Sequence, residues 1–593
     1  MSKAKYFPCL PEYKTPVGGV KTNEQFRIFL AADEGEKAFF VLKKEGEGND
    51  TVYYPMQSSE GGFVIEMAVT TVGLYFYHFE MEKDNKRIGV YSDTDLSATS
   101  VGKEWQLTAY EQKYAVPTLF DSGIIYQIMV DRFCVGKKRI KSKDHMLYRE
   151  DWEGVPFYES DEEGNIPNVD MFGGNLYGVI EKLPYIKSLG AKCIYLNPIF
   201  ESNSNHKYDT ASYRKIDGDF GGEEAFDLLI KKAKKLGIGV MLDGVFSHTG
   251  SDSIYFNKEG RYDSVGAYQS KDSPYYEWYD FENYPNKYDC WWGVKILPCV
   301  KEDNPSFNEF INGEEGIIRH YVRKGIAGWR LDVADELPDK FLDNLTKAAK
   351  SENEGAIVLG EVWEDASNKE AYGKRRRYLL GGQLDSVINY PFKNAIIDFI
   401  KSGDGKVLKN TVYSIVNNYP KTVLDNLMNV LSSHDTARAL TVLSDDTLPK
   451  SKSEQASHKI SDREKALSRL KLAAVLQFCL PGVPSLYYGD EAGMEGGDDP
   501  FNRRCYPWGK EQTDLVKFYK TLGKIKKRKQ LNGGNIVILK AEDGIFDFIR
   551  GESLRIVINA TDKEYRLEKK YKNLLDGQSM DILAPLSAII CKN

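Results

Sequence analysis

Eight short apolar runs in the middle of the chain constrain its fold more than any other feature. They lie at residues 123–130, 191–196, 237–243, 325–332, 355–361, 384–389, 429–435 and 484–491. Between them lie amphipathic stretches such as 221–237 and 463–479, in which apolar residues recur at helical spacing. Eight strands that alternate with helices can close into a parallel barrel. The sequence therefore predicts a central (β/α)8 barrel of the TIM type.

The segments outside the barrel follow other patterns. Residues from about 20 to 115 form short alternating runs between Gly, Asn, Asp and Glu turns, which is typical of an antiparallel sandwich. The connection from Thr249 to about Asp303 is too long for a simple loop and has no clear helix, so we expect an inserted subdomain. Beyond roughly Gln530 short strand-like runs return, at 536–542, 545–551, 554–560 and 582–590. We therefore predict an N-terminal β-sandwich at 1–118, the barrel at 119–248 and 304–515, an inserted subdomain at 249–303 and a small C-terminal β domain at 516–593.

Composition excludes several classes of partner. The formal net charge of -7 comes from 80 basic and 87 acidic residues without a basic block, which argues against nucleic acid. No apolar run is long enough to cross a bilayer. The eight cysteines are scattered without a CxxC pair, which fits a reducing compartment better than a disulfide framework. Because residues 1–14 also lack an apolar h-region, we expect no signal peptide and a cytoplasmic protein.

Polar side chains gather at the ends of four predicted strands. The list runs in chain order: Asp243 and His248, then Arg330 and Asp332, then Glu361, then His434 and Asp435. An edge strand with a solvated ion pair explains segment 328–336 taken alone, and a buried ion-pair network explains any single residue of the set. For the whole set, at successive strand ends of one barrel, catalysis is the better explanation, because those ends converge on one rim.

A metal site is the chemical alternative, since His, Asp and Glu are also metal ligands. Barrel metallohydrolases commonly need two histidines on one strand face, and the chain has no HxH pair. Arg330 would also repel a cation. We therefore favour carboxylate catalysis and predict no catalytic metal.

Two carboxyl groups flanking a glycosidic bond are sufficient for hydrolysis with retention. Asp332 lies beside Arg330, so we expect a lowered pKa suited to a nucleophile. Glu361 follows an apolar run and precedes Trp363, so we expect drier surroundings that keep an acid protonated. Asp435 could hold sugar hydroxyls as the ring flattens. His206, His248 and His434 can hold hydroxyls without adding negative charge.

These motifs resemble those of glycoside hydrolase family 13, the α-amylase family. Segments 243–248 (DGVFSH), 328–336 (GWRLDVADE), 360–363 (GEVW) and 432–435 (SSHD) are similar to its third-, fourth-, fifth- and seventh-strand blocks. NHKYDT (205–210) and VPSLYYGDE (483–491) match further blocks, so the resemblance covers about residues 122–510. It implies Asp332 as the nucleophile, Glu361 as the acid/base and Asp435 as the transition-state stabiliser. The substrate-binding residues that we predict on this basis are His206, Tyr208, Asp243, His248, Arg330, Trp363, His434, Asp499 and Arg503.

The flanking domains and the length resemble the neopullulanase, cyclomaltodextrinase and maltogenic amylase branch. The resemblance implies a sandwich, similar to a carbohydrate-binding module, that narrows the cleft and often packs against a second subunit, so a homodimer is a candidate assembly. The chain departs from the branch at Ser247 and Asp335, where Asn is usual, and at 297–301, where LPCVK replaces MPKLN. After Phe133 the chain reads CVGKKRIKSK, and a cationic loop cannot collect calcium, so we predict no ion there and no cofactor.

The aromatic residues of the insertion are expected to form one wall of the cleft. They are Tyr275, Tyr276, Trp278, Trp291 and Trp292. Three functions stay open at this point. The first is a hydrolase of α-1,4-linked maltodextrins, cyclodextrins, pullulan or starch, with α-1,6 bonds as a second linkage. The second is a 4-α-glucanotransferase with the same residues, and the third is a non-catalytic glucan-binding protein, against which the complete carboxylate triad argues.

Overall fold

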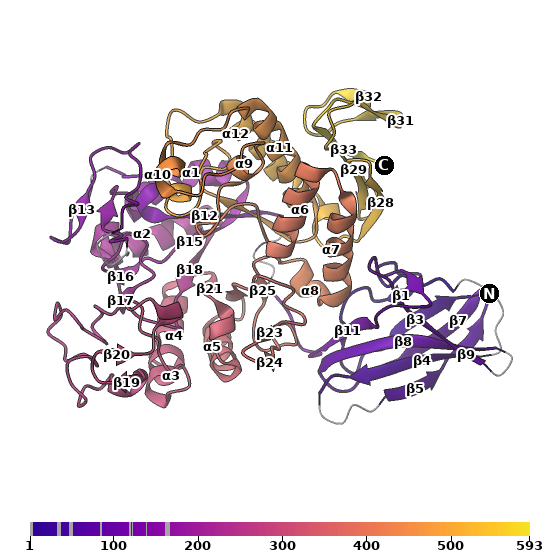
Figure 1. Cartoon of the computed structure of the whole chain (residues 1–593), viewed down its shortest axis with the longest axis horizontal. Helices are drawn as coiled ribbons and strands as arrows, with labels where there is room; N and C mark the ends of the chain where they lie inside the picture. Colours follow the sequence, from indigo (N-terminus) through magenta and orange to yellow (C-terminus); the bar gives the residue numbers. More distant parts are fainter. Residues whose placement is uncertain are drawn as a thin grey trace.

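A closed sheet of eight parallel strands forms the centre of the fold (Figure 1). The computed structural model describes residues 4–32, 37–46, 51–83, 86–117, 120, 122–137, 139–160 and 166–593. The strands follow the order β25-β22-β21-β18-β15-β12-β27-β26, and a parallel bridge between Ile388 and Met428 joins the two ends. Their bounds are β12 Ile124–Ile128, β15 Ala191–Leu196, β18 Gly239–Gly244, β21 Gly328–Leu331, β22 Ile357–Gly360, β25 Ser386–Val387, β26 Met428–Val430 and β27 Val483–Tyr487. All eight predicted strands are confirmed.

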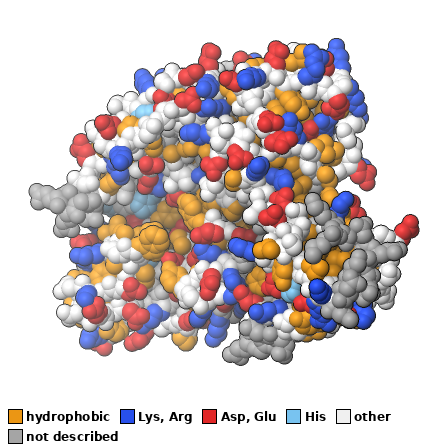
Figure 2. Space-filling model, turned by 45° about the vertical axis from the view of Figure 1, so that its right-hand side comes forward, with side chains coloured by type: hydrophobic (Ala, Val, Ile, Leu, Met, Phe, Trp, Pro, Cys, Tyr) orange, Lys and Arg blue, Asp and Glu red, His pale blue; other side chains and the backbone are white. Residues whose placement is uncertain are grey.

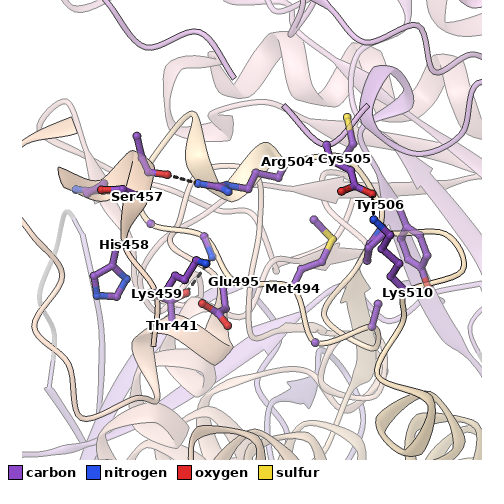
Figure 3. A pocket seen from close by; sticks show the side chains of 18 of the residues that line it. Thr441, Ser457, His458, Lys459, Met494, Glu495, Arg504, Cys505, Tyr506 and Lys510 are labelled. Carbon is purple, nitrogen blue, oxygen red and sulfur yellow. Dashed lines mark hydrogen bonds and ion pairs between the residues drawn. The ribbon is translucent and has the colours of Figure 1, made fainter. Parts of the chain in front are cut away.

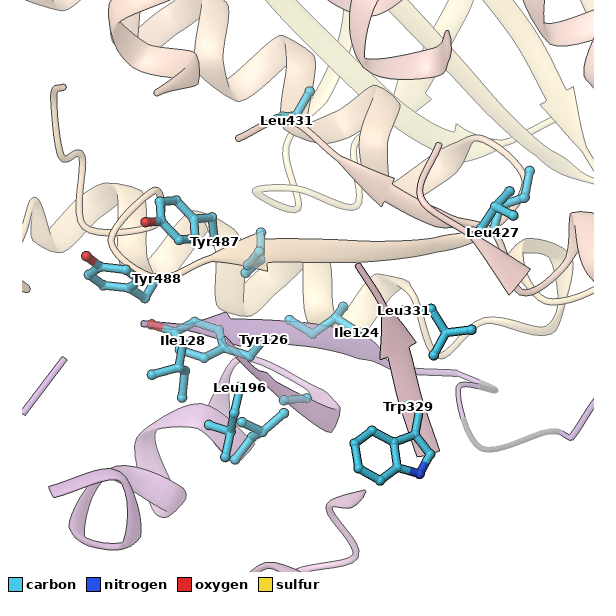
Figure 4. Packing of buried hydrophobic residues seen from close by; sticks show 14 of the residues in the cluster. Ile124, Tyr126, Ile128, Leu196, Trp329, Leu331, Leu427, Leu431, Tyr487 and Tyr488 are labelled. Carbon is cyan, nitrogen blue, oxygen red and sulfur yellow. The ribbon is translucent and has the colours of Figure 1, made fainter. Parts of the chain in front are cut away.

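Alternating side chains of the strands build two separate apolar layers. Ile125 of β12 belongs to the cluster inside the barrel, with Cys193, Met241 and Leu359. Its neighbours Ile124, Tyr126 and Ile128 belong to the layer between sheet and helices (Figure 4). This two-sided burial explains why the runs are apolar throughout. The helices are α1 Leu176–Ser188, α2 Gly222–Lys235, α3 Pro305–Asn312, α4 Ile317–Lys324, α5 Asp339–Glu352, α6 Tyr390–Ser402, α7 Gly405–Asn418, α8 Lys421–Leu424, α9 Ala439–Val442, α10 Lys452–Ser457, α11 Arg463–Cys479 and α12 Thr513–Ile525.

The loops above the barrel carry small ribbons and single turns. Residues 249–303, where an inserted subdomain is predicted, contain short 3-10 turns and one small hairpin but no α-helix. The loop strands are β13 Leu147–Tyr148, β14 Asp170–Met171, β16 Phe200–Ser202, β17 Thr210–Ile216, β19 Phe281–Asn283, β20 Lys287–Tyr288, β23 Glu370–Ala371 and β24 Lys374–Arg375. The 3-10 turns are η1 Val130–Arg132, η2 Gly218–Phe220, η3 Tyr276–Trp278, η4 Trp291–Gly293, η5 Ala334–Glu336, η6 Phe501–Arg503 and η7 Lys529–Leu531.

The N-terminal region is a sandwich of two sheets around its own core. One sheet has the order β1-β3-β7-β6; the other follows β10-β9-β8-β11-β2, with β4 on β8 and β5 on β4. Phe40, Tyr77, Phe79 and Trp105 are among the side chains buried between the sheets. The strands are β1 Lys14–Thr15, β2 Val20–Lys21, β3 Phe26–Ala31, β4 Lys37–Lys44, β5 Thr51–Pro55, β6 Gln57–Ser59, β7 Gly62–Met67, β8 Gly73–Lys83, β9 Lys86–Ser92, β10 Ala98–Thr99 and β11 Trp105–Tyr110. The predicted sandwich is confirmed, whereas the residue numbers of the domain boundaries stay predictions.

The sandwich contacts the barrel through several residues, among them Thr108 and Glu45. Thr108 of β11 donates to the carbonyl of Asn418, at the end of α7, at 2.6 Å. Arg375 of β24 forms a two-point ion pair with Glu45, both contacts being 2.8 Å. The sandwich therefore reaches the β23–β24 ribbon, which follows the fifth barrel strand.

The C-terminal sheets differ from the prediction in two strands. The run 582–590, predicted as one strand, is divided into β32 and β33, because Pro585 lacks an N–H and Leu586 has φ 46°. β31 was missed because its charged residues hide two buried positions, Leu567 and Tyr571. The strands are β28 Ile536–Glu542, β29 Ile545–Arg550, β30 Leu554–Asn559, β31 Tyr565–Lys572, β32 Ser579–Leu583 and β33 Ser587–Lys592. Within the described part of the chain, no helix is both long and apolar enough to span a bilayer.

Candidate active site

Polar side chains from neighbouring strand ends meet at the carboxyl rim of the barrel. Asp243 lies in β18, Arg330 lies in β21 and Glu361 follows β22 directly. Asp243 and Arg330 are register partners in adjacent strands. The parallel topology therefore brings together residues that are far apart in the chain, as the sequence pattern predicted.

Arg330 is the centre of this cluster. Its side chain is fully buried, and its Nη1 donates to Oδ1 of Asp243 and to Oδ1 of Asp332, both at 2.7 Å. Its Nη2 lies 2.8 Å from Oε2 of Glu361. One planar guanidinium thus holds three carboxylates, and it fixes the two predicted catalytic groups on its two terminal nitrogens.

The electrostatics of this cluster differ from the expectation. Burial raises the pKa of Asp332 well above its ordinary value; Arg330 opposes this, while Glu361 and Asp243 raise it further. The predicted lowered pKa of Asp332 is therefore wrong, because one cation is shared by three buried carboxylates. Glu361 is buried at 5% exposure, as the expected drier surroundings require, and its Oε2 accepts from the backbone N–H of Val333 at 2.9 Å and pairs with Arg330.

Tyr208 and His434 extend the cluster on the side of Asp243. The Tyr208 hydroxyl lies 2.9 Å from Oδ2 of Asp243 and 2.5 Å from Nε2 of His434. The two rings stack with centroids 5.2 Å apart and planes inclined by 4°. Burial lowers the pKa of His434 well below its ordinary value, and Arg503 and Arg330 lower it further. A neutral His434 therefore stands beside the acidic groups.

His206 and His248 are brought together through Tyr208. His206 Nδ1 accepts from the backbone N–H of Tyr208 at 3.1 Å, which leaves the proton on Nε2. His248 Nε2 lies 3.2 Å from the carbonyl oxygen of Tyr208, and its Nδ1 lies 3.1 Å from the hydroxyl of Ser247. Burial lowers the pKa of His248 to about 4 and also lowers that of His206. Both rings are neutral groups that can hydrogen-bond a neutral sugar.

Arg503 brings the last two predicted carboxylates together. Its Nη1 lies 3.0 Å from Asp499 Oδ1, and its Nη2 lies 3.8 Å from Asp435 Oδ1. Asp435 Oδ2 lies 3.1 Å from His434 Nε2. Burial raises the pKa of Asp435 to about 7, Glu361 raises it and Arg503 opposes. Asp435 therefore belongs electrostatically to the same cluster as Glu361.

Several residues of the site were not predicted from the sequence. Tyr390 is buried under Trp363, with ring centroids 4.0 Å apart and planes inclined by 3°, while Trp363 itself is 44% exposed. Burial raises the pKa of Tyr390, as do the carboxylates Glu361 and Asp435. Tyr195 donates to Asp243 at 2.6 Å, and Gln127 Nε2 lies 3.0 Å from Nδ1 of His434. The sequence offered one signal for them. Gln127 and Tyr195 are polar side chains within the apolar runs of the first and second strands, and Tyr390 directly follows the run of the sixth strand.

The aromatic residues of the insertion do not form the predicted five-membered wall. Trp278 is buried at 3% exposure, with Tyr275 packed on it at 4.9 Å, and Tyr276 stacks on Phe281. These three residues belong to the insertion's own core, because so small a subdomain needs its large rings for burial. Trp291 lies 5.8 Å from the His248 ring, and Trp292 is 79% exposed beside it.

Lysines neutralise the acidic groups near the loop after Phe133. Lys143 Nζ lies 2.5 Å from Oδ2 of Asp217 and donates to the carbonyl of Ser202 at 2.6 Å. The buried Lys207 lies 3.0 Å from the same carboxylate oxygen. In the described ranges no group of three or more His, Cys, Asp or Glu is arranged to hold a metal ion. The absence of an ion at this loop stays a prediction, which the ammonium contacts support.

Comparison with known proteins assigns the chain to a family. Residues 127–532 match the alpha amylase catalytic domain. A cyclomaltodextrinase from Thermoanaerobacter pseudethanolicus is 33% identical over 583 residues, which cover 95% of this chain and 86% of that protein. The chain therefore belongs to the α-amylase family, glycoside hydrolase family 13.

Other relatives are longer or more distant. An amylopullulanase from Thermoanaerobacter thermohydrosulfuricus is 35% identical over 603 residues, which cover 91% of this chain and 40% of that protein. The chain thus spans less than half the length of this relative. The solved type III pullulan hydrolase from Thermococcus kodakarensis aligns over 100% of both chains with a TM-score of 0.70 and 24% identity, which shows the shared fold alone.

Proposed function

We propose that this protein hydrolyses the α-1,4-glucosidic bonds of maltodextrins, cyclodextrins, pullulan or starch with retention of configuration, with α-1,6 bonds as a second linkage. The observation that carries the proposal is the attachment of Asp332 and Glu361 to the two terminal nitrogens of Arg330. Carboxylates held on one guanidinium lie close together, which fits the separation of about 5 Å of a retaining pair better than the wider inverting pair. The names of the relatives, cyclomaltodextrinase and neopullulanase among them, support the substrate class.

In this proposal Asp332 attacks the anomeric carbon while Glu361 gives its proton to the leaving glycosidic oxygen. Water then attacks the glycosyl-enzyme, and Glu361 takes the proton back. Asp435 stabilises the positively charged transition state from a third side.

The neutral groups around the triad would orient the sugar. His206, His248 and His434 hydrogen-bond hydroxyls, and the exposed face of Trp363 offers an apolar surface to a sugar ring. Asp499 and Arg503, paired at 3.0 Å, would bind the next glucose unit. We assign the same substrate-binding role to Tyr208, Asp243 and Arg330 on the grounds of their contacts in the cluster.

The proposal extends to the size of the substrate and to the assembly. The contact of Glu45 with Arg375 brings the sandwich to a loop of the catalytic rim and supports a cleft that is narrowed on one side. We propose short or cyclic glucans as the preferred substrates and a homodimer as the assembly. All eight cysteines are free, which supports a cytoplasmic location.

A product profile on maltotriose, β-cyclodextrin, pullulan and starch tests the proposal. Shorter α-anomeric products from maltotriose and from β-cyclodextrin are expected. Products longer than maltotriose as the main outcome would instead make the protein a glucanotransferase. No turnover of any of the four, with binding retained, would make it a glucan-binding protein.

A further inference from the structure

A cavity that none of the three predicted catalytic carboxylates lines lies among the loops of the barrel domain. Its volume is about 420 Å³, and none of Asp332, Glu361 and Asp435 lines it. Its walls come from residues 152–153, Thr441, residues 455–463, and the region after β27 at 492–510 (Figure 3). A volume of this order is typical of small-molecule sites of about 300–1,000 Å³ and exceeds the needs of a single ion.

The lining of this cavity carries uncompensated positive charge. Lys459, Arg463, Arg504 and Lys510 contribute four cations, against two carboxylates. Both carboxylates are already engaged, since Glu153 pairs with Lys510 and Glu495 pairs with Arg463. Among the described residues, Lys459, which is exposed, and Arg504, which is half-buried, have no carboxylate partner. Figure 2 shows acidic and basic side chains interspersed over one face of the molecule.

Arg504 is held in the wall with part of its hydrogen-bonding capacity unused. Its Nη2 donates to the carbonyl of Ala456 at 2.7 Å, which fixes the side chain across the cavity wall. Its Nε is buried and has no hydrogen-bond partner. Burial lowers the pKa of this guanidinium, with no acidic neighbour to offset the effect. A desolvated cation without a counter-charge is unfavourable, and an anionic ligand would offset that free energy.

Trp152 contributes an aromatic ring to the lining of this cavity. The indole N–H of Trp152 donates to the carbonyl of Tyr506 at 2.9 Å, which fixes the ring. A fixed aromatic ring suits the face of a sugar.

We propose that this cavity is a second binding site that takes a phosphorylated sugar, with the phosphate on Lys459 and Arg504 and the sugar against Trp152. The site does not depend on the proposed hydrolytic function. It is assigned to the small-molecule class because the cavity is larger than a phosphate and its lining includes an aromatic ring.

The test is calorimetric titration of the full chain with glucose 1-phosphate, inorganic phosphate and glucose, with maltose present to fill the catalytic site. Glucose 1-phosphate is expected to bind more tightly than phosphate, and glucose not to bind. Lys459→Met should weaken glucose 1-phosphate binding about tenfold, the usual effect of losing one charged hydrogen bond. Lys450→Met is the matched control, an exposed lysine of the same segment outside the cavity, and should bind like the wild type.

Equal affinity of Lys459→Met and the wild type would overturn the site, and so would glucose binding as tightly as glucose 1-phosphate. Equal affinity for phosphate and glucose 1-phosphate would overturn the sugar part of the assignment. Arg504→Met is a second variant, with its melting temperature measured because Arg504 also holds Ala456; retained affinity in a folded Arg504→Met would count against the proposal. Turnover of maltotriose by the same variants is expected to be unchanged, so a failure of the hydrolase proposal leaves this test intact.

Discussion

Replacing Arg330 by methionine tests the view that one guanidinium holds the catalytic carboxylates together. Arg330 is fully buried and contacts Asp243 and Asp332 at 2.7 Å and Glu361 at 2.8 Å. Methionine fills a similar volume but carries no charge. Arg330→Met would therefore leave three buried carboxylates without their cation.

The expected loss follows from the number of contacts. Removing one partner of a buried ion pair destabilises a protein by about 3–5 kcal/mol, because the remaining charge stays buried. Three carboxylates share Arg330, so we expect a loss of unfolding free energy near the upper end of that range at pH 8. Activity should fall by at least about 100-fold, because two charge-assisted hydrogen bonds to the catalytic pair, each worth about 1.5–3 kcal/mol, are lost.

The loss should depend on pH with a definite sign. Burial already raises the pKa values of Asp332 and Asp243 in the folded protein, and Arg330 lowers both. Without Arg330 the folded-state pKa values rise further above the unfolded values. A carboxyl group whose pKa is higher in the folded than in the unfolded state lowers the free energy of unfolding as the pH rises through the folded-state pKa. Below the unfolded-state pKa it causes no such loss. The difference in unfolding free energy between the wild type and Arg330→Met is therefore expected to be smaller at pH 5 than at pH 8.

Thermal unfolding of the wild type and Arg330→Met between pH 5 and pH 8 measures this. Arg566→Met is the matched control, because Arg566 is 71% exposed and pairs with Asp581 at 3.1 Å on the surface. The control should lose little stability at any pH. A deficit of Arg330→Met that is constant over this pH range, or an unchanged melting temperature at pH 8, would refute the reasoning.

Four further predictions address roles, metal, substrate size and pH. Asp332→Asn should abolish turnover of every glucan, whereas Glu361→Gln should impair aryl maltosides less than natural glucans, because good leaving groups need little protonation; equal losses in Glu361→Gln on both substrate types would contradict its role as the acid. EDTA should leave activity and melting temperature nearly unchanged, because Lys143 neutralises Asp217; a drop that calcium restores would reveal a missed site. The ratio kcat/KM should be higher for maltooligosaccharides or cyclodextrins than for soluble starch, and deletion of residues 1–115 should reduce that preference or unfold the protein; a clear preference for starch would exclude the narrowed cleft. Burial raises the pKa of Glu302 to about 8, so wild-type stability should fall from pH 5 to pH 8 relative to Glu302→Gln, and parallel curves would contradict this.

The sequence by itself determined the barrel and which polar residues lie together at its rim. Each barrel strand could be predicted from the sequence, because a strand that is buried on both faces is a continuous apolar run. Parallel topology then brings all strand ends to one rim, so residues at those ends, such as Asp243, Arg330 and Glu361, were predictable neighbours. The sandwich could also be predicted, because the alternation of apolar and polar residues along its strands is a local property of the chain.

Only the tertiary structure decided how these groups interact. The pKa of Asp332 is raised because desolvation and two further carboxylates outweigh Arg330, and no sequence pattern states how many acids share one cation. Trp278 faces the core of the insertion, whereas Trp292 faces solvent, although both lie in the same aromatic segment. The cavity around Arg504 joins residues 152, 459 and 510, which lie in separate segments of the chain. The burial of a side chain and the number of charges around it depend on neighbours that are distant in the sequence. Both can therefore be known only from the folded chain.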